Sequence, residues 1–126
     1  MNDSSPAMAP AQEDFELETR LVHAGTLRSD FAETSEAIFL TQGHVYETAE
    51  QCEARFKGED PGYIYARFSN PTVGMFEARM AALEGAEAAR ATATGMAAVT
   101  ASLLGQLRAG DHVVAARQLF GSCRFV

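Results

Sequence analysis

The stretch "EAARATATGMAAVTASLLGQLRAGDHVVAA", residues 87–116, decides the fold class of this chain. Its first eight residues are small and partly β-prone, so we interpret them as a buried strand, although the alanines would also suit a helix. Gly95 ends that strand. Apolar residues then recur at helical spacing until a glycine stops the helix: Met96, Val99, Leu103, Leu107 and Gly110. "HVVAA", residues 112–116, is a second short strand. Strand, helix and strand form a βαβ unit, which predicts an α/β fold with a mostly parallel sheet.

A short helix is predicted upstream from its own start and stop signals. "TAEQ" is a capping box, because the Thr48 hydroxyl can accept from the amide of Gln51 and the Gln51 side chain can reach back. The helix should run to Lys57 and stop at Gly58.

The segment "YIYARFSNPT", residues 63–72, leads into a longer helix. "YIYARF" is predicted to be extended. "SNPT" predicts a helix start with Asn70 as N-cap and Pro71 at the first position, where its missing N–H costs nothing. One apolar stripe follows at helical spacing and a glycine ends it: Val73, Phe76, Met80, Leu83 and Gly85.

Composition limits the classes of partner. Hydrophobic residues make up 47% of the 126, which allows a core and argues against global disorder. The net charge of −7 argues against nucleic acid and anionic membrane surfaces. No apolar run reaches the length of a membrane span, and no secretory signal opens the chain. Cys52 and Cys123 lack metal-type spacing, so they are interpreted as reduced packing residues of a cytoplasmic protein, and no metal site is expected.

Three parts are expected along the chain. Residues 1–14 are rich in Ser, Pro, Ala and acidic residues and are predicted to be a disordered tail. Residues 15–60 are predicted to be an extended arm with little core, plus the short helix, and to make oligomer contacts; a poorly ordered lead-in is the alternative. Residues 61–126 begin the large α/β domain. Because two strands cannot close a sheet, we expect the chain to be the truncated, N-terminal piece of a longer protein.

Three local features could hold an anion or a ring, and each also has a plainer interpretation. At Gly95 free helix amides favour an anion, with Thr94 adding a hydroxyl, yet most such junctions bind nothing. Arg67 is a good bidentate partner for a phosphate, with the Tyr65 phenol nearby, yet a surface arginine beside core tyrosines is commoner. Phe120 lies in a glycine-flanked loop, where ordinary packing is favoured on local grounds.

A resemblance joins these features. The segments "ETRLVHAG", "YIYARFSNPT", "EARMAALEGAEAARATATGMAAV", "GDHVV" and "LFGSCRFV" occur in the order found in the Cys/Met-metabolism family of pyridoxal-phosphate (PLP) enzymes. The resemblance covers residues 17–126. "FLTQGHVYETAEQCEARFKGEDPG" and "LFGSCRFV" look most like its O-succinylhomoserine sulfhydrylase branch. The resemblance implies the start of a fold-type-I PLP-dependent transferase large domain, with helices flanking the sheet, preceded by an extended N-terminal arm.

The resemblance also implies a site for pyridoxal 5′-phosphate. In the family, the Tyr and Arg that match Tyr65 and Arg67 bind the cofactor phosphate of the neighbouring subunit. The amides that match Gly95 and Met96 bind the phosphate of their own subunit. An aromatic residue stacks on the pyridine ring at the position of Phe120, where many members have Tyr instead of Phe.

The remaining chemistry is expected beyond Val126: the Schiff-base lysine, the aspartate that pairs with the pyridine nitrogen and the arginine for the substrate carboxylate. The only lysine of the chain, Lys57, lies in the turn "FKGEDPG" and is interpreted as an exposed surface charge. No catalytic residue is therefore assigned within the chain, and residues 1–126 alone are expected to be inactive.

The function that the resemblance implies is PLP-dependent O-succinylhomoserine sulfhydrylation, in which sulfide replaces succinate and gives homocysteine for methionine biosynthesis. The active species is expected to be a homodimer or homotetramer, because the Y-x-R segment completes a neighbour's site. Two alternatives stay open. One is a cystathionine γ-synthase or a methionine or cystathionine γ-lyase of the same family; the other is a catalytically inert truncated fragment. The reading frame beyond Val126 would separate enzyme from fragment.

Overall fold

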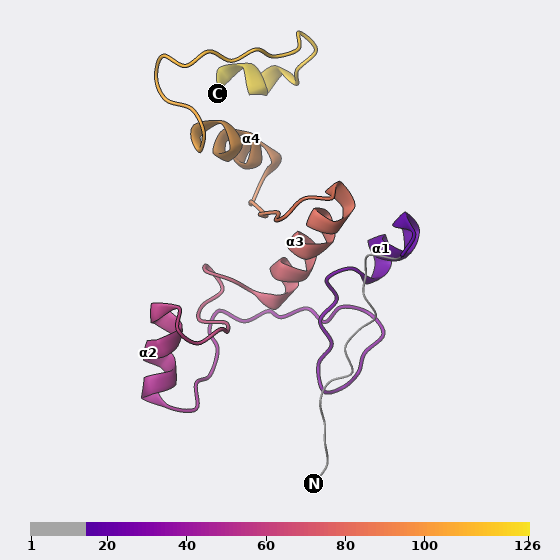
Figure 1. Cartoon of the computed structure of the whole chain (residues 1–126), viewed down its shortest axis with the longest axis vertical. Coiled ribbons are helices and arrows are strands. Elements are labelled where there is room, and N and C mark those ends of the chain that lie inside the picture. Colours follow the sequence, from indigo (N-terminus) through magenta and orange to yellow (C-terminus); the bar gives the residue numbers. More distant parts are fainter. Residues whose placement is uncertain (1–14) are drawn as a thin grey trace. The chain divides into compact units, whose positions relative to one another are not determined.

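The computed structural model describes residues 15–126, so the predicted tail at residues 1–14 lies outside them (Figure 1). The regular elements are α1 (Leu17–His23), α2 (Ala49–Lys57), α3 (Pro71–Glu84), α4 (Gly95–Leu104) and the 3-10 helix η2 (Gly121–Phe125). No helix in this described part is long and apolar enough to span a membrane.

The chain divides after Ala89 into two compact units, of which the second is Arg90–Val126. The first unit therefore contains the predicted arm and also residues 61–89, the first 29 residues of the predicted cofactor domain. The functional division at residue 60 stays a prediction.

Helix α2 forms where the capping box predicted it. Thr48 Oγ1 accepts a hydrogen bond from Gln51 N at 3.1 Å, and Gln51 Oε1 accepts one from Glu47 N at 2.9 Å. Gly58 ends the helix in the left-handed conformation at φ 76°, which glycine adopts without a steric penalty. Both predicted ends are confirmed, with the Gln51 side chain reaching one residue beyond the cap.

Helix α3 also begins and ends as predicted. Asn70 Oδ1 accepts from Thr72 N at 2.9 Å, Pro71 occupies the first position, and Gly85 follows the last turn at φ 61°. The chemistry of the two ends is local, which is why the sequence shows it.

The buried face of α3 differs from the predicted apolar stripe. Val73 and Phe76 are 44% and 54% exposed, whereas Met75 is 2% exposed and faces the end of α1. Helical periodicity identified a helix correctly, but it gave the wrong face to the interior at these two positions. The reason is a contact far along the chain: Met75 Sδ accepts a hydrogen bond from Leu27 N at 3.2 Å, 48 residues away, just beyond the end of α1.

Helix α1 corrects the prediction of an extended arm. Leu17–His23 pack against α3 instead of lying free of a core (Figure 1). Arg20 Nη1 donates to the Ala82 carbonyl at 3.3 Å, and Arg79 Nε donates to the Ala24 carbonyl at 3.2 Å. A seven-residue helix is marginal by itself, so these tertiary contacts stabilise it and no periodic pattern announces it.

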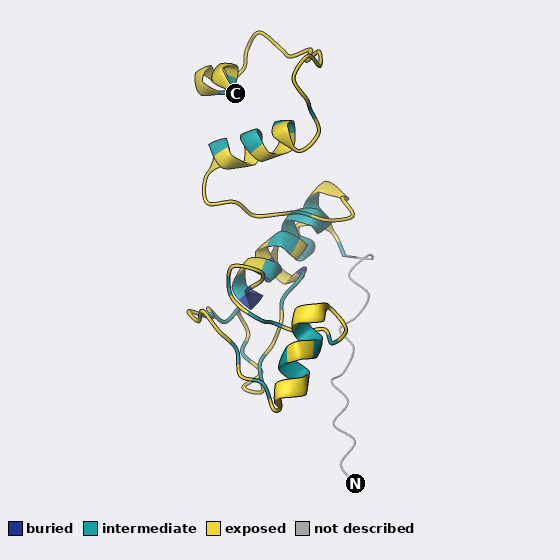
Figure 2. Ribbon diagram, turned by 90° about the vertical axis from the view of Figure 1, so that its left-hand side faces the viewer, coloured by how far each residue is buried: buried dark blue, intermediate teal, exposed yellow. Residues whose placement is uncertain are grey.

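Little of the described chain is buried (Figure 2). Within residues 15–126 the buried residues are Ala24, Asn70, Pro71 and Met75. Asn70, Pro71 and Met75 lie at the start of α3, and Ala24 directly follows α1, which packs against α3. The core of the first unit therefore lies directly beside the "SNPT" turn and the loop that precedes it.

The second unit keeps the helix of the predicted βαβ unit but not its strands. Helix α4 ends at Leu104 and not near Gly110, and Leu107 N closes a turn onto the Leu103 carbonyl at 2.9 Å. Residues 87–94 and 112–116 form no strand in the described chain. A strand requires a hydrogen-bonded neighbour, and a lone pair of short strands is marginal in water. The two strand predictions are thus not realised within residues 15–126, and the mostly parallel sheet stays a prediction.

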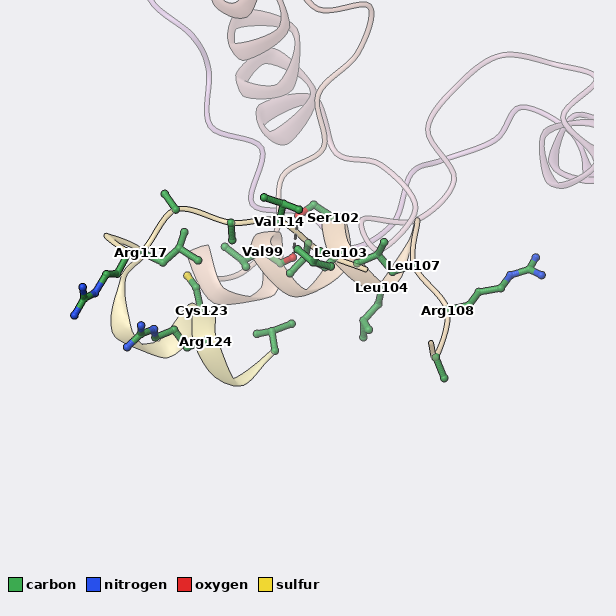
Figure 3. Close-up of a pocket in the computed structure, with 16 residues that line it drawn as sticks. Val99, Ser102, Leu103, Leu104, Leu107, Arg108, Val114, Arg117, Cys123 and Arg124 are labelled. Carbon is green, nitrogen blue, oxygen red and sulfur yellow. Dashed lines mark hydrogen bonds between the residues drawn. The ribbon is translucent and has the colours of Figure 1, made fainter. Parts of the chain in front are cut away.

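The apolar side of α4 faces η2, which the sequence did not predict, and the segment that precedes it. Helix α4, η2 and the segment between them line an open pocket of 1120 Å³ (Figure 3). Its apolar lining includes Val99, Leu103, Leu107, Val114 and Cys123. Cys123 is a free thiol here, as is Cys52.

Candidate cofactor-binding site

The loop between α2 and α3 carries Tyr65 and Arg67. Tyr65 forms an isolated antiparallel bridge with Gly43, and Ala66 N donates to the Gln42 carbonyl at 2.7 Å. The chain then turns, because Phe68 N donates back to the Tyr65 carbonyl at 2.8 Å. The prediction of an extended "YIYARF" therefore holds only as far as Tyr65. Arg67 is on a hydrogen-bonded turn, where its side chain is exposed.

The guanidinium of Arg67 lies between two aromatic rings. Its Cζ is 5.3 Å from the centroid of Tyr65 and 5.6 Å from that of Phe68. Such cation–π contacts orient an arginine while leaving its N–H groups available, and at exposed sites each contributes about 0.5–1 kcal/mol. Within residues 15–126 no carboxylate pairs with Arg67. The arrangement presents an un-neutralised guanidinium beside a phenol, which suits an anionic ligand.

Helix α2 supports the beginning of this loop. Arg55 Nε binds Asp60 Oδ2 at 2.9 Å, and Arg55 Nη1 donates to the Tyr63 carbonyl at 3.4 Å. The same guanidinium lies 5.6 Å from the ring centroid of Tyr46. The Tyr46 hydroxyl in turn donates to the Ile64 carbonyl at 3.1 Å. The approach to Tyr65 is therefore fixed by side chains from both α2 and the arm.

The second group of predicted residues lies at the start of α4. Thr94 is the N-cap, and its hydroxyl accepts from Ala97 N at 3.0 Å. Since Ala97 is satisfied in this way, the first-turn amides left for a ligand are those of Gly95 and Met96, the pair that the resemblance implies. A Cβ at Gly95 would meet nothing within 4 Å, so the side-chain side of Gly95 is open. The helix dipole favours an anion before the first turn.

Phe120 and Lys57 complete the predicted set. Phe120 precedes η2 and is 71% exposed, so its ring is available for stacking and is not a core residue of this chain. No ring contact or hydrogen bond in the described part joins Phe120 to Gly95 or Met96. Lys57 Nζ pairs with Glu53 Oε1 at 2.5 Å on the surface of α2.

The predicted residues fall into two sets. Tyr65 and Arg67 belong to the first compact unit, and Gly95, Met96 and Phe120 belong to the second. Each set presents groups that suit a phosphate or an aromatic ring, which is the donor chemistry that pyridoxal phosphate requires.

Sequence reasoning missed the arm residues that hold the Tyr65–Arg67 turn, namely Phe39, Gln42 and Tyr46. It also assigned Asn70 only the role of a helix cap. No periodic or capping signal marks these residues, because their partners lie many positions away in the chain.

Comparison with known proteins places the chain in a family. Residues 18–126 match the family described as Cys/Met metabolism PLP-dependent enzyme. The chain is 57% identical over 102 residues to O-succinylhomoserine sulfhydrylase of Mycobacterium tuberculosis, covering 81% of this chain and 25% of the relative. It is 49% identical over 106 residues to the Pseudomonas aeruginosa protein of the same name, covering 84% and 26%. An L-methionine gamma-lyase of Fusobacterium nucleatum is 44% identical over 109 residues.

A solved structure supports the same family. A putative O-acetylhomoserine (thiol)-lyase from Campylobacter jejuni, which contains N′-pyridoxyl-lysine-5′-monophosphate, matches with a TM-score of 0.79 and 30% identity over 88% of this chain and 28% of that one. The chain spans about a quarter of the length of the curated relatives it matches. On the strength of the family match and these identities, the chain belongs to the Cys/Met-metabolism family of enzymes, whose cofactor is pyridoxal phosphate.

Proposed function

We propose that the whole protein carrying this chain is an O-succinylhomoserine sulfhydrylase, which replaces succinate by sulfide to give homocysteine. The observation that carries this proposal is the higher identity to two O-succinylhomoserine sulfhydrylases, 57% and 49%, than to the methionine gamma-lyase at 44%. That last relative supports a second candidate, γ-elimination by a lyase of the same family. Bound pyridoxal phosphate supplies an electron sink for either reaction.

The residues of this chain are proposed to hold the phosphate and the ring of the cofactor. Arg67 and Tyr65 would donate to the phosphate in a neighbouring subunit, and the amides of Gly95 and Met96 to the phosphate in their own. Phe120 would stack on the pyridine ring. Three observations support this fit: Arg67 has no carboxylate partner within residues 15–126, the space at Gly95 is open, and the Phe120 ring is exposed.

The amine that holds the cofactor is not proposed to come from residues 1–126. Lys57 is the only lysine, it is paired with Glu53, and its side chain is 54% exposed. A lysine that forms a Schiff base must have its amine free to attack, whereas the amine of Lys57 is engaged by the Glu53 carboxylate on the surface of α2. We therefore propose that residues 1–126 alone have no sulfhydrylase activity.

Self-association is the proposed partner interaction. Several large apolar side chains of the arm are more than 70% exposed: Phe31, Ile38, Leu40 and Val45. An exposed apolar group of this kind typically meets another protein surface. A second copy of the protein is the partner that also uses Tyr65 and Arg67.

The test is a substrate comparison with the purified whole protein. Homocysteine formation from O-succinylhomoserine and sulfide should exceed α-ketobutyrate release from methionine by at least roughly 100-fold in kcat/KM, about 2.7 kcal/mol of difference in transition-state binding. Comparable rates, or a preference for methionine, would transfer the assignment to the lyase.

A further inference from the structure

One residue of the arm, Phe39, has both of its backbone groups held by the start of α3. Phe39 N donates to Thr72 Oγ1 at 2.9 Å, and Asn70 Nδ2 donates to the Phe39 carbonyl at 2.9 Å. The partners lie 33 and 31 residues apart in the chain. We call these three residues the Phe39 clamp. It is a specific cross-link, because the donor and the acceptor of one peptide residue are satisfied by two side chains.

Asn70 performs two separate tasks in this clamp. Its Oδ1 accepts from Thr72 N and caps α3, while its Nδ2 donates to the arm. At 8% exposure it is the buried polar side chain of the described chain. The capping task needs only an oxygen, which Asp or Ser supplies equally well. The contact with the arm needs an N–H donor, which only the amide provides.

The clamp lies at one end of a closed ring of backbone. Ala66 N donates to the Gln42 carbonyl at 2.7 Å, and Gly43 bridges to Tyr65. Residues 39–42 and 66–70 are therefore tied together at both ends. Arg67 lies within the second of these two segments, one residue after the Ala66 contact and three residues before Asn70.

Arg67 itself has few anchors. Its side chain is exposed and contacts only the rings of Tyr65 and Phe68 among the interactions of the described chain. The direction of its guanidinium thus follows from the turn that carries it. That turn is fixed by its two tied ends, since closing a short loop at both ends removes most of its conformational freedom.

We propose that Asn70 and Thr72 are positioning residues for the cofactor phosphate: by clamping Phe39 they fix the turn from which Tyr65 and Arg67 reach the phosphate. This inference rests on the proposed role of Arg67. It extends that role to the arm. If the arm were displaced, the turn would be held at one end only, and the Arg67 guanidinium would no longer be fixed at the phosphate position.

The experiment separates the clamp from the helix cap in the whole protein. Asn70→Asp keeps the cap oxygen but replaces the Nδ2 donor by a carboxylate against the Phe39 carbonyl. Thr72→Val removes the acceptor for Phe39 N and leaves the side-chain shape. The control is Ser29→Ala, which removes two side-chain hydrogen bonds of the arm, one to Glu33 and one from Phe31, whereas each clamp variant removes one; neither control bond reaches the loop.

The dissociation constants of pyridoxal and of pyridoxal phosphate for the apoprotein are measured by absorbance. The quantity compared is the constant of pyridoxal, which lacks the phosphate, divided by that of pyridoxal phosphate. Each clamp variant should weaken pyridoxal phosphate roughly three- to tenfold, as expected for one net hydrogen bond, and leave pyridoxal unchanged within twofold. Ser29→Ala should change neither. Faster hydrogen exchange of the amides of residues 63–70 in the clamp variants should accompany the change.

Arg67→Ala distinguishes a failure of the phosphate role of Arg67 from a failure of the positioning role of the clamp. If this variant keeps the ratio, the proposed phosphate role of Arg67 fails. If it lowers the ratio while Asn70→Asp and Thr72→Val keep it, or if the clamp variants weaken both ligands equally, the clamp is merely structural and the inference is overturned. Should Asn70→Asp not fold, Thr72→Val alone decides by the same ratio.

Discussion

Arg79→Met is expected to release helix α1 from α3. Arg79 Nε donates to the Ala24 carbonyl, and Nη2 donates to the Val22 carbonyl and the Thr26 hydroxyl, each at 3.2 Å. The same guanidinium pairs with the Glu36 carboxylate. Methionine keeps an unbranched stem that can pack on α1, but it removes all of these donors. The substitution therefore tests whether polar anchors or apolar packing hold α1.

The magnitude follows from the surroundings of these bonds. The Arg79 side chain is 24% exposed, so water can reach part of the site, and each of the three bonds to neutral acceptors contributes about 0.5–1.5 kcal/mol. Their loss sums to about 2–4 kcal/mol. The ion pair with Glu36, whose side chain is 32% exposed, adds only about 0.2–1 kcal/mol. A double-mutant cycle with Glu36→Gln should accordingly give a coupling energy below about 1 kcal/mol.

Native-state hydrogen exchange in the whole protein measures this loss directly. Amides of α1 should exchange roughly 30- to 1000-fold faster in Arg79→Met, while those of α2 keep their protection. Glu36→Gln is the matched variant and should change α1 exchange less than about fivefold. Equal effects of the two substitutions would show that the ion pair holds α1, and equal acceleration of α1 and α2 would show global unfolding. Either outcome would contradict the role assigned to the Arg79 bonds with neutral acceptors.

Four further outcomes are expected. Gly25→Ala should lower the free energy of unfolding by about 2–4 kcal/mol in denaturant titrations, because Gly25 has φ 72° and an added Cβ would lie 2.6 Å from a side-chain carbon of α3; no change would mean that α1 shifts without cost. Arg67→Ala should weaken pyridoxal phosphate binding by about 2–4 kcal/mol, and an unchanged dissociation constant would contradict the phosphate role. The hydrogen bond from the Ser29 amide is the largest of several contacts that lower the pKa of Glu33. Because the folded pKa lies below the unfolded one, the contact stabilises the arm above the unfolded pKa, and this stabilisation is lost as the pH falls through the folded pKa. The Ser29 amide should therefore gain exchange protection from acid toward neutral pH, and Glu33→Gln should abolish that gain. If the whole protein self-associates as proposed, Leu40→Glu should lower its mass in light scattering, since Leu40 is 94% exposed in the single chain; a fully active wild-type monomer would refute self-association.

The sequence predicts those elements whose ends are chemically local. The Thr48 capping box and the "SNP" turn lie within four residues of the amides that they satisfy, so both helices begin where expected. Helix α1 could not be predicted in this way, because Arg20 and Arg79 stabilise it across 62 and 55 residues. The strands predicted at 87–94 and 112–116 are not formed within the described residues for a related reason. Their residues have β-propensity, but a strand exists only when a partner supplies its hydrogen bonds.

The candidate site divides along the same line. At Gly95 the sequence predicts a helix start with free amides, but the assignment of Gly95 and Met96 to a phosphate came from the family resemblance and stays a prediction. Arg67 was assigned through the family resemblance of "Y-x-R", and no sequence pattern indicates the turn that carries it or its contacts with the Tyr65 and Phe68 rings. The Phe39 clamp was invisible, since neither the irregular arm nor a helix cap indicates a contact 31 residues away.

The small interior explains why single polar contacts matter so much in this chain. The buried residues of the described part are Ala24, Asn70, Pro71 and Met75. So few buried side chains make only a small apolar contribution to the free energy of folding. The arm must then be held by hydrogen bonds such as those of Arg79 and Asn70, each of which is a sizeable fraction of the available free energy. The bonds of Asn70 and Thr72 join the arm to the start of α3, so the short turn that precedes α3 is held by the arm and carries Arg67. Packing of the exposed apolar arm against a second copy would therefore stabilise the phosphate-binding turn as well, which couples assembly to cofactor affinity in the proposed enzyme.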